Sequence, residues 1–407
     1  MKKIISAFLS FLLIVPVLCS CAKNTTADDD GKTGADAVSL KVWTTNDRLE
    51  KTKQIVEKFK DEDETNDWDI TVSAVDDVKN QMINDPADIA DVFCISSEEF
   101  NDLYKSGSLS KIEKDEAALK IRNTEDSVKV ATTDKSLYAY PLSVNTLVMY
   151  YDKSIFNEDE VKHLESILFK DLGEGKTNLS FDMSSSDVLT SFFLTAGCSL
   201  YGEDGNDTTK CDFNSAEGQA AAEYLVDLAS NDKFVSADEK KILSDFSSGN
   251  LGCAFLSSKS CDEVKKALGE NFAVSRLPSV SINDSDKQLK SVTKYEMYAV
   301  SSQSEKAKEA MELADYLSAM DAQEALADIL IVPTNMALCA KEDFLNKNEF
   351  INAVVEQAKE SSHEPTVEKI TVYRTSASTL GSKISSKEYT KSDIKTKLDD
   401  FVKEITD

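Results

Sequence analysis

The side chains best suited to binding a polar solute follow the first predicted strand. Thr45, Asn46, Asp47 and Arg48 offer a hydroxyl, an amide, a carboxylate and a guanidinium group in one short stretch. In open α/β folds, ligands bind in the crevice beyond the carboxyl ends of the strands. These four residues are therefore candidates for hydrogen bonds to a ligand. Asp47 also fits a capping box with Glu50, so a purely structural role for Asp47 stays open.

Catalytic and metal-binding patterns are weak elsewhere in the sequence. The two histidines, His163 and His363, lie in no recognised motif, and we find no nucleophile elbow, P-loop or dinucleotide fingerprint. The cysteines after Cys21 form no C-x-x-C pair, which argues against a zinc site. A carboxylate pair of the glycosidase kind stays open because acidic residues are abundant. We expect a protein that is not an enzyme and needs no metal or cofactor.

Two motifs that could suggest a metal favour structural roles. Ferric-ion binders use adjacent tyrosines, but Tyr150 and Tyr151 lie on a predicted strand, where neighbours point to opposite faces. The acidic segment 201–207, with sequence YGEDGND, lacks the spacing and the terminal glutamate of an EF-hand calcium loop. We therefore interpret it as a polar turn.

The elements that must position the ligand-binding candidates alternate between strands and helices. The stretch Leu40–Phe59 predicts a strand followed by an amphipathic helix, and alternating apolar residues from Trp68 predict a second strand. The apolar run 90–95 predicts a strand that is buried on both faces. A capping box, Ser96 with Glu99, then begins a helix. This alternation predicts a parallel sheet and hence an α/β fold.

The second half of the chain is predicted to be richer in helices. The extended apolar segment 137–156 has no helix of its own and could run from one lobe into another. Periodic apolar residues predict three helices and two strands further on, at 188–196, 216–229, 307–317, 249–256 and 271–277. Disulfides between the cysteines nearest in sequence, Cys198–Cys211 or Cys253–Cys261, and buried free thiols both stay open.

The N-terminal residues have the pattern of an export signal. Residues 1–20 combine two lysines with an apolar run that is too short for an ordinary membrane-spanning helix, and the polar stretch 21–37 predicts a flexible tether. The working part of the chain, about 370 residues, is long enough for two lobes. A formal net charge of −27 argues against nucleic acid as a partner.

Several stretches together resemble the extracellular solute-binding proteins of ABC importers, in particular the maltose- and oligosaccharide-binding branch. They occur in the family's order and comprise LKVWTTNDR, ADVF with YKSGSLSKI, YAYPLSVNTLVMYYDKSIF, FNSAEGQAAAEYLVDLAS, FSSGNLGCAF, NFAVSRLP and MYAVSSQSEKAKEAMELADYLSAMDAQEAL. The end of the apolar run, Leu-Cys-Ser-Cys, resembles a bacterial lipobox. That resemblance implies cleavage before Cys21 and lipidation of this cysteine.

The resemblance also implies a set of residues that contact the ligand. Asp47, Arg48 and Glu98 fall where family members place polar groups against sugar hydroxyls, Asn145 follows the crossover at Pro141, and Ser185 and Asp187 lie near a further contact loop. The family's aromatic platforms are largely missing. A polar SSKS segment around Lys259 replaces a tryptophan, and the late aromatic helix offers Tyr373. Trp43 could reach the cleft from the first strand, whereas Trp68 is expected in the core.

The resemblance implies a two-lobe periplasmic-binding-protein-like fold of the class II type, with a ligand cleft between the lobes. We expect an N-terminal lobe formed by 38–142 with 291–337, and a C-terminal lobe formed by 143–290 with 338–407. The expected protein is a monomer on the outer face of the bacterial cell membrane. It would bind a maltodextrin-like carbohydrate and deliver it to an ABC permease. Surface capture of a polysaccharide without transport, and import of a small non-sugar solute, stay open.

Overall fold

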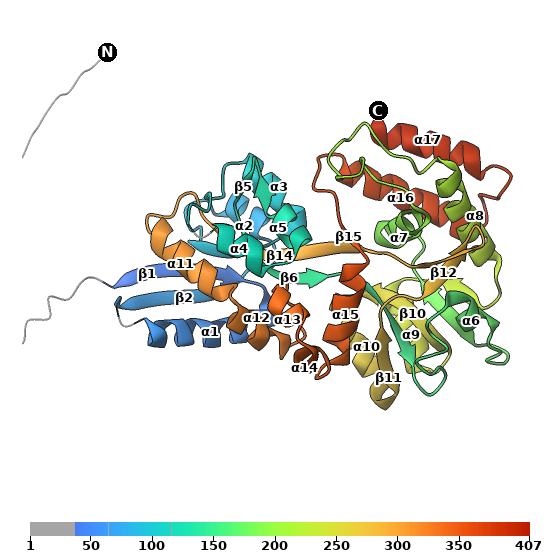
Figure 1. Ribbon diagram of the computed structural model, residues 1–407, viewed down its shortest axis with the longest axis horizontal. Coiled ribbons are helices and arrows are strands. Elements are labelled where there is room, and N and C mark those ends of the chain that lie inside the picture. Colours follow the sequence, from blue (N-terminus) through green and yellow to red (C-terminus); the bar gives the residue numbers. More distant parts are fainter. Residues whose placement is uncertain (1–36, 64, 115) are drawn as a thin grey trace, which may run out of the picture. The chain divides into compact units, whose positions relative to one another are not determined.

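The computed structural model describes residues 37–63, 65–114 and 116–407 (Figure 1). The predicted signal peptide, the lipidation candidate Cys21 and nearly all of the tether lie outside these residues. Within the described ranges, no helix is both long and apolar enough to cross a membrane.

The first sheet follows the predicted alternation of strands and helices. Its order is β15-β14-β3-β1-β2, with β6 also paired to β14. The predicted parallel arrangement is confirmed for β1 with β2 and β3, whereas β14 runs antiparallel to both β3 and β6. The strands are β1 (Val38–Thr44), β2 (Trp68–Ala74), β3 (Val92–Ser96), β6 (Tyr140–Asn145), β14 (Val292–Val300) and β15 (Ser362–His363).

The chain passes from the first sheet to the second over a single residue. Thr146 alone separates β6 from the next strand, so the extended segment runs between the two sheets, as its composition predicted. The order of the second sheet is β11-β7-β10-β8-β9. Its strands are β7 (Leu147–Asp152), β8 (Thr177–Phe181), β9 (Phe234–Ser236), β10 (Leu251–Ser257) and β11 (Phe272–Ser275). Two further pairs of strands form separate two-stranded sheets: β4 (Thr132–Thr133) with β5 (Ser136–Leu137), and β12 (Ser279–Ile282) with β13 (Ser285–Gln288).

Helices pack around both sheets. Figure 1 shows α1 beside β1 and β2, and α16 with α17 near α7 and α8. Those of the first half are α1 (Leu49–Glu62), α2 (Val78–Asn84), α3 (Ser97–Lys105), α4 (Glu116–Arg122), α5 (Glu125–Val130), α6 (Leu164–Phe169) and α7 (Ser186–Ala196). Those of the second half are α8 (Ala216–Ser230), α9 (Glu239–Ser247), α10 (Cys261–Leu268), α11 (Ala307–Leu317), α12 (Met320–Ala327), α13 (Met336–Cys339), α14 (Glu342–Leu345), α15 (Glu349–Lys359), α16 (Ile370–Ser385) and α17 (Ile394–Thr406), and the 3-10 helices are η1 (Asn46–Arg48), η2 (Ser258–Ser260) and η3 (Gly269–Asn271).

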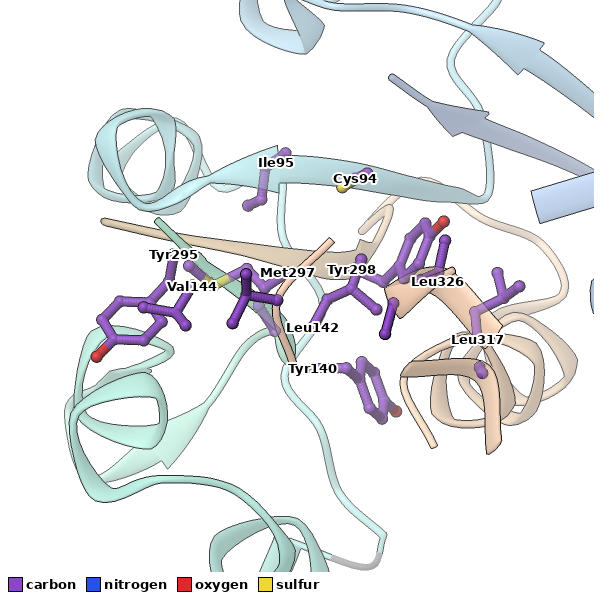
Figure 2. Packing of buried hydrophobic residues seen from close by; sticks show 14 of the residues in the cluster. Cys94, Ile95, Tyr140, Leu142, Val144, Tyr295, Met297, Tyr298, Leu317 and Leu326 are labelled. Atoms are coloured by element: carbon purple, nitrogen blue, oxygen red, sulfur yellow. The ribbon is translucent and has the colours of Figure 1, made fainter. Parts of the chain in front are cut away.

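The apolar core fixes β14 between β3 and β6. Figure 2 shows Ile95 of β3, Val144 of β6 and Met297 of β14 among the buried side chains. The Tyr298 hydroxyl lies 3.2 Å from the Thr44 hydroxyl, which links β14 to the end of β1. Burial of one large apolar side chain contributes about 1.5–3 kcal/mol, so this packing stabilises β14 between its neighbours. The pairing of β14 with β6 shifts register between Glu296 and Met297.

One predicted helix cap is confirmed and the other is wrong. Ser96 and Glu99 form the complete capping box at the start of α3. Asp47 does not cap a helix through its side chain, because residues 46–48 form the 3-10 turn η1 and α1 begins at Leu49. The Arg48 side chain is drawn into the interior, with 1% of its surface exposed. The helix therefore starts beyond Arg48, and Asp47 stays in front of it.

The structure also shows to which faces of β7 the two adjacent tyrosines point and whether the cysteines form disulfides. Tyr150 and Tyr151 belong to two different apolar clusters, which confirms that they point to opposite faces of β7. The cysteines from Cys94 onward are free thiols, so neither Cys198–Cys211 nor Cys253–Cys261 forms a disulfide. Burial raises the pKa of the Cys94 thiol to about 12, because the thiolate would lose its hydration.

Candidate ligand-binding site

Glu296 is a charged residue in the middle of the apolar strand β14. Its carboxylate accepts hydrogen bonds from the Arg48 guanidinium, from Lys259 Nζ at 2.7 Å and from Ser143 Oγ at 3.0 Å. Arg48 approaches from the end of β1, and Ser143 from the paired strand β6. Lys259 lies on η2, directly after β10 of the second sheet. This cluster, which we call the Glu296 cluster, therefore joins elements of both sheets.

The charges of the Glu296 cluster compensate one another. Burial alone would raise the pKa of Glu296, but the adjacent Arg48 and Lys259 hold it at about 2, well below its usual value of 4.5. Burial would likewise lower the pKa of Arg48, yet Glu296 raises it well above its ordinary value. Both groups are thus ionised at neutral pH. Paired charges of this kind can remain in an interior without large cost.

The segment between the two sheets lies beside the Glu296 cluster. The Ser258 amide donates to the Thr146 carbonyl at 2.8 Å, and the Thr146 amide donates to Ser258 Oγ at 3.2 Å. Ser258 Oγ in turn donates to Asn145 Oδ1 at 3.2 Å. These bonds place Asn145 and Lys259 next to each other where the chain passes from β6 to β7.

Two adjoining cavities open onto these side chains. The first has a volume of about 620 Å³ and is lined by Asp47, Arg48, Asn145, Lys259 and residues 328–332, among others. The second, of about 500 Å³, is lined by Thr45, Asn46 and Glu98 and shares Asp47, Lys259 and Glu296 with the first. We call the two cavities together the polar cleft. Its lining offers both donors and acceptors, and no aromatic ring is among the lining residues.

Lys294 is the centre of a second group of charges on the same strand. Its Nζ lies 3.0 Å from Asp187 Oδ2, 3.4 Å from Glu98 Oε1 and 3.7 Å from Glu364 Oε1. Arg374 on α16 contacts Glu98 and donates from Nε to Glu364 Oε1 at 3.0 Å. We call these five residues the Lys294 cluster. Glu98 connects it to the polar cleft, because Glu98 also lines the second cavity.

Negative charges outnumber positive ones in the Lys294 cluster. Burial would lower the pKa of Lys294, but Asp187, Glu364 and Glu98 raise it, so the ammonium group stays protonated. Burial raises the pKa of Glu364, although Arg374 and Lys294 oppose that effect. Three carboxylates thus share two cations.

The two aromatic candidates for stacking lie in the core. Trp43 is 6% exposed and Tyr373 is 2% exposed. The Tyr373 hydroxyl bonds to Thr190, and its ring packs edge-on against Phe213 and Phe401. Neither ring lines the polar cleft, so their stacking role stays a prediction. Trp68 is buried against Phe59, as expected of a core residue.

The structure brings most of the predicted site residues together. Those that line the polar cleft are Thr45, Asn46, Asp47, Arg48, Glu98 and Asn145. Asp187 and Glu98 both contact the ammonium group of Lys294, so the two carboxylates lie close together. Sequence reasoning missed Ser143, Lys294, Glu296, Glu364 and Arg374. One signal was present, because Lys294 and Glu296 are two charges at alternating positions of the otherwise apolar strand VTKYEMYAV.

A serine–histidine–aspartate contact elsewhere does not form a catalytic relay. His163 Nδ1 lies 2.6 Å from Ser279 Oγ and 3.5 Å from Asp286 Oδ2. Both partners thus contact the same ring nitrogen, whereas a relay needs one partner at each nitrogen. The His163 side chain is also half exposed.

Comparisons with known proteins agree with this architecture. A model of the bacterial extracellular solute-binding proteins matches residues 54–350. The maltodextrin-binding protein MdxE of Bacillus subtilis (strain 168) is 25% identical over 402 residues, covering 91% of this chain and 89% of that protein. The ligand-free maltodextrin-binding protein MalE1 of L. casei BL23 aligns with a TM-score of 0.84 at 25% identity, covering 92% of this chain and 100% of the other. MalE of Listeria monocytogenes, solved with maltose, aligns with a TM-score of 0.78 at 22% identity, covering 91% and 98%. These likenesses confirm the predicted two-lobe α/β fold.

Proposed function

The chain belongs to the family of bacterial extracellular solute-binding proteins, and from this premise we propose that it is the carbohydrate-binding subunit of an ABC importer. One observation carries the proposal: Asp47, Asn145 and Lys259 reach the same polar cleft from elements of both sheets. A ligand there would meet carboxylate, amide and ammonium groups. Such a mixture of acceptors and donors suits a solute that carries many hydroxyl groups.

The relatives support a sugar as the solute. MdxE is named for maltodextrin, and a protein 27% identical to this chain, matched over 91% of it, was solved with acarbose. The mechanism we propose is closure of two lobes around the sugar, which shifts the population toward the form that a permease accepts. The lobes would be 38–142 with 291–337, and 143–290 with 338–407. Because β6 reaches Asn145 in the first sheet, the first crossover fits better at Thr146.

A small polar solute other than a sugar is the second candidate. No aromatic ring lines the polar cleft, while apolar sugar faces bind well to exposed rings. A ligand held through hydrogen bonds and charge alone has no need of such a surface. Amino acids and polyols are the solutes that this reading favours.

A thermal-shift screen of residues 38–407 separates the two candidates. The ligands are maltose, maltotriose, maltotetraose, polyols and amino acids. A ligand at a hundred times its dissociation constant stabilises the folded protein by about 2.7 kcal/mol, which raises the melting temperature by a few degrees. We expect a shift that grows with maltodextrin length. A shift with a polyol or amino acid and none with a sugar would replace the first candidate by the second.

Two matched aspartate variants test the position of the site. Asp47 and Asp88 have equally exposed side chains, 57% each, and each contacts one cation. Asp88 precedes β3, at the end of the strand away from the polar cleft. We expect Asp47→Asn to weaken maltotetraose binding about tenfold, whereas Asp88→Asn leaves it unchanged. Equal affinities of the two variants, measured by calorimetry, would place the site elsewhere.

Anchoring through Cys21 and delivery to a permease complete the proposal. The lipobox resemblance and the polar tether support a lipid anchor on the outer face of the membrane. In cells fed a palmitate analogue, the wild-type protein should be labelled and should stay with the membrane fraction. Cys21→Ser should lose the label and appear in the medium. Retained labelling in this variant would contradict an anchor at Cys21.

A further inference from the structure

Lys294 occupies a special position on β14. It lies two residues before Glu296, so the two side chains leave the same face of the strand. The three carboxylates around its ammonium group come from different parts of the chain: Glu98 from the first turn of α3, Asp187 from the first turn of α7, and Glu364 from the residue after β15. Lys294 is thus a common partner of groups that are far apart in sequence.

Two of these carboxylates are residues that we expect to contact the ligand. Glu98 lies in the first turn of α3, which packs on the first sheet, whereas Asp187 lies in the first turn of α7, whose apolar residues belong to the second apolar cluster. Without Lys294, Arg374 would still pair with Glu98 and Glu364, whereas Asp187 would lose the one ion pair that it makes with a described residue. Like charges at such short range repel one another, and the repulsion would push α3 and α7 apart.

We propose that Lys294 is the positioning residue of the binding site, because its ammonium group holds the Glu98 and Asp187 carboxylates at a set separation. Each carboxylate keeps one oxygen for a ligand. The shortest contacts of both side chains use the other oxygen, and no described residue donates a hydrogen bond to Asp187 Oδ1 or to Glu98 Oε2. Two acceptors at a set distance would recognise two hydroxyl groups of one sugar.

An ordinary surface ion pair has none of these features. Lys79 pairs with Asp102 alone, and its side chain is 45% exposed, compared with 28% for Lys294. Lys79→Met is therefore the matched control for Lys294→Met. Lys294→Arg retains the charge and serves as the conservative variant.

The inference rests on the proposed carbohydrate function, so two readouts are needed. The first is the dissociation constant for maltotetraose between about pH 5 and about pH 7.5. At the upper end we expect Lys294→Met to bind about tenfold more weakly than wild type, and Lys294→Arg and Lys79→Met to bind within about threefold. The loss should shrink toward about pH 5, because a proton taken up by Glu364, whose pKa is raised by burial, replaces the missing positive charge beside Arg374.

The second readout is the melting temperature of the ligand-free variants over the same pH range. Lys294 is one of the cations that lower the pKa of Glu364, so its removal raises this pKa further in the folded state, and Lys294→Met should gain stability relative to wild type as the pH falls. A loss of affinity that is the same at every pH, or a melting temperature that tracks wild type at every pH, would overturn the positioning role. If wild type does not bind maltotetraose, the proposed function fails, and the melting profile still decides whether Lys294 holds the carboxylates.

Discussion

The Glu296 cluster and the Lys294 cluster lie two residues apart on one strand and differ in almost every physical respect. Glu296 is an anion held by two cations, and Arg48 and Glu296 are nearly inaccessible, with 1% and 8% of their side chains exposed. Lys294 is a cation among three carboxylates, and its side chain and those of Glu98, Asp187 and Arg374 are 26–39% exposed. The first cluster has one positive charge in excess, whereas the second has one negative charge in excess.

The difference indicates that the two clusters on β14 have different roles, one in stability and the other in ligand binding. A cluster around a buried carboxylate is costly to disturb, so it suits the fixed part of a site. A partly exposed cluster with excess acceptors can exchange contacts with a ligand at smaller cost, because water screens its charges. We therefore expect mutations in the Glu296 cluster to act mainly on stability, and mutations in the Lys294 cluster to act mainly on binding.

The largest expected effect comes from removing Arg48, and the matching change in the other cluster is removal of Arg374. Arg48→Met leaves the buried Glu296 carboxylate with Lys259 and Ser143, and we expect a loss of about 3–5 kcal/mol in the free energy of unfolding. Arg374→Met removes a half-buried partner and should cost about 1 kcal/mol or less. Urea denaturation at neutral pH measures both. Equal losses would show that the two clusters do not differ in the way that their burial indicates.

Acid should affect the two clusters in opposite directions. The pKa of Glu296 in the folded state, about 2, is below its ordinary value of 4.5, so the stability that it contributes is complete above 4.5 and is lost as the pH falls to 2. The pKa of Glu364 is raised in the folded state, so the folded protein takes up a proton there more readily than the unfolded chain does. The contribution of Glu364 to stability therefore grows as the pH falls through its raised pKa.

The Glu296→Gln variant isolates the acid response of the Glu296 cluster. The difference in unfolding free energy between wild type and Glu296→Gln should shrink by on the order of 3 kcal/mol as the pH falls from about 4.5 to about 2. Denaturant midpoints at intervals across this range measure the change. A difference that stays constant would mean that Glu296 is not selectively stabilised in its ionised form.

The smallest expected effect concerns Lys259, the exposed member of the Glu296 cluster. Its side chain is 61% exposed, so the ammonium group keeps much of its hydration while it contacts Glu296. Lys259→Met should lower the unfolding free energy by at most about 1 kcal/mol, because exposed charges contribute little. A loss as large as that of Arg48→Met would show that Lys259, rather than Arg48, compensates the buried carboxylate.

Local patterns predicted part of the fold. The alternation of apolar residues located β2, the apolar run located β3, and the three periodic segments located α7, α8 and α11. The Ser96–Glu99 capping box was also predictable, because both partners lie within one turn. The same rule was wrong for Asp47. There the neighbouring Arg48 turns toward Glu296, which is 248 residues away, and the start of the helix moves with it.

The candidate site was predictable in part. Residues after β1 and β3 were located by the rule that ligands bind beyond the carboxyl ends of strands, and the structure brings them to one cleft. The rule says nothing about β14. This strand follows the strands of the second sheet in sequence and then pairs antiparallel with β3 of the first sheet. Its two charges were visible in the sequence, but their partners were not.

The sequence by itself determined the alternating strands and helices, because each depends on the spacing of apolar residues within one short segment of the chain. It also determined the supply of polar groups at the strand ends. Only the tertiary structure decided that Arg48 and Lys259 meet Glu296, and that Glu98 and Asp187 meet Lys294. Charge pairing depends on distance in space, and that distance follows from how the elements of two sheets, joined at Thr146, are packed.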